Sequence, residues 1–133
     1  MSGSTVEVTE ANFKDVVERE GMVLLDWWAP WCGPCRAFGP TYERVAARHP
    51  DVVFGKVNTE EQQQLAGAFE IRSIPTLMIL RDKVLLYAEA GALPEGALED
   101  LVAKVRGLDM AEVRRQIAAA GEKGAGGEAP ERG

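Results

Sequence analysis

The pair Cys32 and Cys35, which comes directly after an apolar run, constrains the fold more than any other feature of this chain. Residues 22–28 are nearly all apolar, and such a run predicts a central strand that helices cover on both faces. Helix-compatible sequence begins around Cys35. The two cysteines, the only ones in the chain, therefore lie at a predicted strand-to-helix junction. A helix N-terminus has unpaired N–H groups and a partial positive charge, which favour the thiolate that attacks disulfides.

Three other interpretations of the cysteines fit less well. Structural zinc normally has four ligands, and besides the cysteines the chain offers one distant histidine, His49. A structural disulfide between residues three apart closes almost no loop and hardly constrains the unfolded chain. Gly33-Pro34 indicates an exposed turn, which counts against two ordinary buried cysteines. A Cys-x-x-Cys pair near a βαβ pattern predicts a redox-active dithiol.

Length and charge exclude several classes of protein. A chain of 133 residues predicts one domain with a substantial core. A formal charge of −6 argues against a general binder of nucleic acid or of anionic membranes. The chain has no apolar run of the length that spans a bilayer, and its polar N-terminus lacks the layout of a signal peptide. We expect a cytoplasmic protein, in a compartment where structural disulfides are rare.

The order of apolar patterns predicts an α/β fold. The expected sheet is mixed and five-stranded, with three parallel strands, an antiparallel hairpin at one side and helices on both faces. The expected strands lie around Val6–Val8 and at residues 22–28, 52–57, 76–80 and 84–88. The first two expected helices run from a cap at Thr9 to about Gly21 and from about Cys35 to His49, with a kink at Pro40. The next two run from a capping box at residues 59–62 to Phe69 and onward from Pro94. Residues 81–83 lack glycine, which counts against a tight two-residue turn in the hairpin.

The C-terminal part extends beyond this pattern. We predict a domain over residues 1–108, an additional helix over 109–120 and a disordered tail over 121–133. The additional helix has Met110, Val113 and Ile117 on one side. It would either pack on the domain or serve as a docking element for a partner.

Several separated motifs resemble those of the thioredoxin family. Residues 31–35 read Trp-Cys-Gly-Pro-Cys, residues 26–30 before them read Asp-Trp-Trp-Ala-Pro, and residues 73–76 read Ser-Ile-Pro-Thr. The likeness covers roughly residues 5–108 and implies the thioredoxin fold. It also implies a monomeric protein-disulfide reductase without a cofactor other than its own cysteine disulfide. Its implied partners are disulfide-containing client proteins and a thioredoxin reductase, an NADPH-dependent flavin enzyme that recycles it.

The residues themselves suggest roles in the exchange reaction. Cys32 precedes the helix, so we expect an exposed nucleophilic sulfur, and Cys35, one turn into the helix, should be the more buried resolving thiol. Asp26 lies within an apolar strand, where burial raises the pKa of a carboxyl toward that of a base active near neutral pH. The alternative is a carboxylate that hydrogen-bonds nearby backbone. Lys56 matches a family lysine that lies near this aspartate.

The resemblance also implies a surface for substrate. Thioredoxins have a cis proline at the position of Pro75, although X-Pro bonds are ordinarily trans, and the backbone of Ile74 would then pair with an extended client. The rest of the implied apolar surface is Trp31, Gly33, Pro34, Gly91 and Ala92. The Gly33-Pro34 pair fits a reductant, whereas related oxidases and isomerases usually have Gly-His or Pro-His there. A structural subunit that docks through the 109–120 helix is the alternative of another class.

Overall fold

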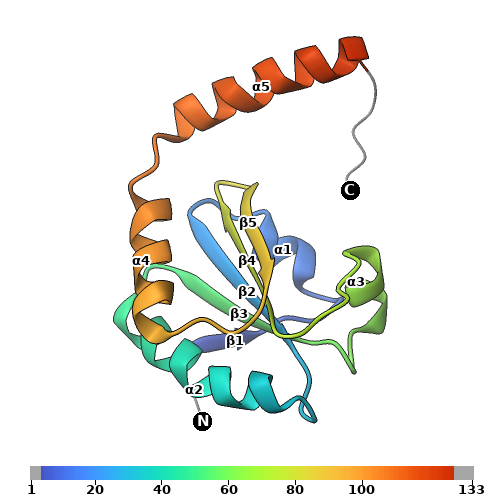
Figure 1. Ribbon diagram of the computed structural model, residues 1–133, viewed down its shortest axis with the longest axis vertical. Coiled ribbons are helices and arrows are strands. Elements are labelled where there is room, and N and C mark those ends of the chain that lie inside the picture. Colours follow the sequence, from blue (N-terminus) through green and yellow to red (C-terminus); the bar gives the residue numbers. More distant parts are fainter. Residues whose placement is uncertain (1–3, 128–133) are drawn as a thin grey trace.

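The computed structural model describes residues 4–127, with side chains described as far as Gly121, and its centre is a mixed five-stranded sheet (Figure 1). The strand order is β1-β3-β2-β4-β5. β1, β3 and β2 run parallel, whereas β4 is antiparallel to both β2 and β5. This topology confirms the predicted set of three parallel strands with a hairpin at one side. The strands are β1 (Thr5–Glu7), β2 (Met22–Trp28), β3 (Val53–Asn58), β4 (Thr76–Arg81) and β5 (Val84–Ala90).

Helices cover both faces of the sheet, as predicted. The long helices α2 (Gly33–Arg48) and α4 (Glu95–Arg106) pack on one face around Leu24 of β2. The short helices α1 (Phe13–Val17) and α3 (Gln63–Ala68) lie on the other face, around Leu25. β2 is buried along six of its seven residues because it is central in the sheet and covered on both sides. In residues 4–127, no helix combines the length and the apolar character needed to cross a bilayer.

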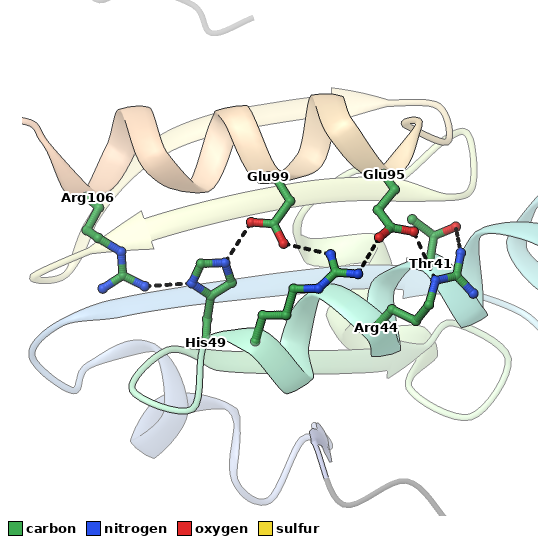
Figure 2. A network of polar contacts seen from close by, with 7 residues as sticks. Thr41, Arg44, His49, Glu95, Glu99 and Arg106 are labelled. Atoms are coloured by element: carbon green, nitrogen blue, oxygen red, sulfur yellow. Dashed lines mark hydrogen bonds and ion pairs between the residues drawn. The ribbon is translucent and has the colours of Figure 1, made fainter.

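A chain of polar contacts joins the two long helices (Figure 2). Glu95 and Glu99 of α4 pair with Arg48 of α2, and Arg44 contacts Glu95 at 2.9 Å. His49, at the end of α2, lies between Glu99 and Arg106. Because arginine only donates, the Nδ1 atom of His49 accepts from Arg106 and its Nε2–H donates to Glu99. These contacts hold α4 against α2 at the edge of the core.

The hairpin turn differs from the expectation. Asp82 and Lys83 alone connect β4 to β5, with φ angles of 52° and 74°, so a tight two-residue turn forms without glycine. The turn is held from outside: the Asp82 carboxylate accepts from the Gly21 N–H at 2.8 Å, and the Asp82 N–H donates to the Gly21 carbonyl at 2.9 Å. Aspartate also tolerates positive φ better than most residues. Because of these contacts, the tight turn forms although the missing glycine counted against it.

Two predicted helix starts were also wrong. Thr9 does not cap α1; its N–H donates to the side chain of Asn12, the residue that directly precedes the helix. The capping box at residues 59–62 does not form, because the Thr59 hydroxyl donates to the Trp28 carbonyl and α3 begins only at Gln63. At Thr59 the hydroxyl that would cap the helix bonds a strand carbonyl instead, and at Thr9 the helix begins four residues later.

Helix α5 (Met110–Gly127) projects from the body of the protein along the top of Figure 1. Met110 is buried, and Arg114 donates to the Asp82 carbonyl, whereas the side chains of residues 114–121 are exposed. The expectation that this helix packs on the domain therefore holds only for the first turns of α5. Residues 121–127, expected to be disordered, are helical. Residues 128–133 of the predicted tail lie outside the described residues.

Arg81 holds the junction between α4 and α5. One nitrogen of its guanidinium donates to the carbonyls of Val105, Arg106 and Leu108. We expect Arg81→Ala to lower the free energy of unfolding by about 1–2 kcal/mol, because it leaves these terminal carbonyls without a charged donor. Urea unfolding measures this change. Arg72→Ala, at an exposed arginine, is the matched control, and equal losses in both variants would contradict the prediction.

Candidate active site

The cysteine pair lies where β2 passes into α2. Cys32 precedes the first residue of α2 with extended backbone (φ −87°, ψ 116°), and its sulfur accepts from the Cys35 N–H at 3.1 Å. Pro34 fits in the first turn because the missing proline N–H would have no helical partner there. Cys32 and Cys35 form a disulfide. The predicted strand-to-helix junction is thus confirmed, with one sulfur at the positive end of a helix of 16 residues.

Both cysteines are largely covered in this oxidised form. Cys32 is 5% exposed and Cys35 is 3% exposed, so the expected exposure at Cys32 is not present in the disulfide form. The reason is packing: the two cysteines form a small cluster with Ala29, against which Trp28 and Ile74 lie. A client disulfide therefore has to contact the residues around the cysteines in order to reach either sulfur.

The Ile74–Pro75 loop faces the disulfide. Its peptide bond is cis, and the Ile74 carbonyl oxygen lies 3.8 Å from the Cys32 sulfur. Gly91, with a φ of 114°, donates its N–H to the Pro75 carbonyl at 2.7 Å. Hydrogen bonding thus brings the Gly91-Ala92 loop to the proline loop. The fold therefore places the Ile74–Pro75 bond beside Cys32 and the Gly91-Ala92 loop beside Pro75.

Several residues of the predicted client surface are exposed. Trp31 is 64% exposed, and Gly33, Pro34 and Ala92 are also exposed. The Trp31 indole N–H donates to the Glu60 carboxylate at 2.7 Å, and this contact fixes the direction of the ring. Glu60 was not among the predicted residues. No local pattern indicates it, because the contact joins residues 29 positions apart.

Asp26 lies within β2 and is buried. Neither of its carboxyl oxygens has a hydrogen-bond partner among the residues that the structure describes, so the alternative of a carboxylate satisfied by backbone is not what is seen. Burial raises the pKa of Asp26 from 3.8 to about 7; the positive charge of Lys56 opposes the rise and the negative charge of Glu43 adds to it. Such a group exchanges a proton near neutral pH.

Lys56 lies opposite Asp26 in the register of β2 with β3. Its Nζ atom stands 4.6 Å from the centre of the Trp28 ring, at the side of a cavity of about 350 Å³ that Thr5 and Glu61 also line. Thr5 in turn donates to Glu43 of α2 at 2.8 Å. Sequence reasoning missed Glu43, since only the packing of α2 beside β1 brings it near Asp26.

Comparison with known proteins identifies the family. The thioredoxin family model matches residues 4–104. This chain belongs to the thioredoxin family. Among curated thioredoxins, thioredoxin 2 of Streptomyces coelicolor is 56% identical over 115 residues, 86% of each chain. Thioredoxin 1 of Synechococcus elongatus is 44% identical over 99 residues, 73% of this chain and 92% of that one. A solved mutant thioredoxin from Halobacterium salinarum superposes with a TM-score of 0.73 at 30% identity, over 81% of this chain and 96% of that one.

As a thioredoxin, the protein is a protein-disulfide oxidoreductase that acts by dithiol–disulfide exchange at the Cys32–Cys35 pair. The redox-active disulfide is formed in this structure. Within residues 4–121, His, Cys, Asp and Glu side chains form no group of three or more that could hold a metal ion.

Proposed function

We propose that this thioredoxin works as a reductant of client disulfides, with Cys32 as nucleophile, Cys35 as resolving thiol and Asp26 as base. The observation that carries this proposal is the placement of Cys32 at the start of α2, where its sulfur accepts a backbone N–H from the first turn. In the reduced form that donor and the helix dipole stabilise a Cys32 thiolate. The Gly33-Pro34 pair between the cysteines supports a reducing rather than an oxidising member of the family.

The proposed reaction has two exchanges. The Cys32 thiolate attacks one sulfur of the client disulfide, the client S–S bond breaks, and the departing client sulfur takes up a proton. Asp26 then accepts the proton of the Cys35 thiol, and Cys35 attacks the Cys32 sulfur. The bond between Cys32 and the client breaks, and the second client sulfur leaves as a thiolate and takes up the proton that Asp26 accepted. Two electrons have then passed to the client, and the Cys32–Cys35 disulfide of this structure has formed. Lys56, opposite Asp26, would lower the pKa of that carboxyl and so tune the step.

The surface around the disulfide would hold the client. We assign this surface to Trp31, Gly33, Pro34, Ile74, Pro75, Gly91 and Ala92. The Ile74 carbonyl beside the Cys32 sulfur supports pairing with an extended client segment. We further propose that residues 1–108 form the working domain, that the protein acts as a monomer in the cytoplasm, and that an NADPH-dependent thioredoxin reductase recycles it.

The equilibrium reduction potential of the Cys32–Cys35 pair tests the proposal. We expect a value near the −270 mV that characterises thioredoxins, measured in a thiol–disulfide buffer with tryptophan fluorescence as readout. Trp28 packs against the cysteine cluster and should report the change. A value between about −180 and −120 mV would instead indicate an isomerase or oxidase and would overturn the assignment as reductant.

A further inference from the structure

The sheet face that carries α1 and α3 is incompletely covered. These helices have five and six residues, against 16 and 12 for the helices of the opposite face. The part of the face over β4 and β5 is left open as two adjoining depressions, which share Phe69 and Met78. We name these two depressions together the β4–β5 groove.

One end of the groove begins at the residues that flank the Ile74–Pro75 bond. Its first depression, of about 250 Å³, includes Ser73 and Thr76, which flank the Ile74–Pro75 bond. The Ile74 carbonyl is the group that lies 3.8 Å from the Cys32 sulfur. From there the depression follows β5 along Ala88–Ala90. A chain that is attached to Cys32 as a mixed disulfide and passes along the Ile74–Pro75 loop would therefore meet this end of the groove.

The far end of the groove is apolar throughout. Its second depression, of about 180 Å³, has Leu25, Met78 and Leu80 as apolar residues of β2 and β4. The other lining residues are Phe13, Val17, Phe69 and Leu85. Apolar cavities of roughly 150 Å³ bind benzene, so the volume fits one aromatic side chain. The Phe13 and Phe69 rings, 5.2 Å apart and tilted, add aromatic surface of the kind on which another ring packs.

The backbone beside the groove suits an extended polypeptide. β5 is the last strand of the sheet and pairs only with β4 among the described residues, so its outer edge is open to strand addition. Ala90 pairs with Thr76 and Leu85 pairs with Leu80. The distance along β5 from the proline loop to the apolar end is therefore five residues, roughly 17 Å of extended chain.

We propose that the β4–β5 groove binds an extended segment of the client, and that its apolar end receives an aromatic side chain about five residues from the client cysteine that Cys32 attacks. This inference rests on the proposed function and adds to it a preference for unfolded, aromatic-containing clients. The continuity of the groove with the Ile74–Pro75 loop and the open edge of β5 favour a peptide over other apolar ligands.

Peptide disulfides test the preference. Two peptides are made, each with one cysteine joined to a small thiol, and with Phe or Ala five residues from that cysteine. We expect the KM of the Phe peptide to be lower by about tenfold, since burying a side chain in an apolar pocket is worth about that much. Leu85→Glu, at a residue that is 49% exposed, should abolish this difference between the two peptides.

The matched control is Ile117→Glu, which introduces the same charge on α5 at a residue that is 51% exposed. It should retain the tenfold preference. Equal KM values for the two peptides with the wild-type protein, or a preference that survives Leu85→Glu, would overturn the proposal.

A binding measurement separates the groove from the chemistry. The same peptides with Ser in place of Cys are titrated into the oxidised protein while the Met78 methyl and Trp27 indole N–H signals are followed by NMR. Trp27 lies beside Phe69, with ring centres 5.6 Å apart. Shifts with the Phe peptide alone support the groove even if neither disulfide is reduced, an outcome that would refute only the proposed function. Identical responses to both peptides would refute the groove.

Discussion

Cys35→Ser is expected to stop turnover while leaving the first exchange intact. Cys32 would still attack a client disulfide, but without the Cys35 thiol the mixed disulfide has no internal attacker and accumulates. We expect steady-state reduction of a protein disulfide to fall by a thousandfold or more, roughly the loss seen when a member of a cooperating catalytic set is removed. Mass spectrometry of the intact protein detects the adduct.

Cys32→Ser is the matched control for this variant. It should be equally inactive yet form no adduct, because Cys35 lies inside the first turn of α2, whereas Cys32 precedes the helix and lies beside the Ile74 carbonyl. If Cys32→Ser accumulated the adduct and Cys35→Ser did not, the two roles would have to be exchanged.

Asp26→Asn is expected to stabilise the protein and to slow its turnover of client disulfides near pH 7. The unfolded Asp26 loses its proton above about pH 4, whereas burial keeps the folded carboxyl protonated up to about pH 7. Between these values the free energy of unfolding therefore falls as the pH rises. Above pH 7 the stability that the protonated carboxyl contributes is completely lost. A pKa raised from 3.8 to about 7 corresponds to roughly 4 kcal/mol.

Urea unfolding of the oxidised protein near pH 4 and pH 8.5 measures this effect. The increase in the free energy of unfolding caused by Asp26→Asn should be small at the lower pH and reach about 2–4 kcal/mol at the higher pH. The cost of burying the asparagine amide is subtracted from this increase. Asp100→Asn, at an exposed aspartate of α4, is the control and should change neither value. A stability gain that does not depend on pH would contradict the raised pKa. Equal turnover of wild type and Asp26→Asn from about pH 6 to pH 9 would argue against the role as base.

The sequence predicted the parts of this protein that depend on local pattern. The apolar run before Cys32 correctly indicated a central strand covered on both faces, because burial on both sides requires apolar residues in succession. Asp26 was recognised for the same reason, as one polar residue within that run. The family motifs further implied the cis bond before Pro75, which the structure contains.

Only the tertiary structure decided how distant residues act on each other. The turn at Asp82 forms without glycine because Gly21, 61 positions away, binds both its N–H and its carboxylate. Glu60 meets Trp31, and Glu43 comes near Asp26, through the docking of separate elements. The β4–β5 groove exists because the short helices α1 and α3 leave part of the sheet face beside the hairpin uncovered. Spacing along a chain reports which face of an element is buried, whereas contacts between elements depend on how their faces pack.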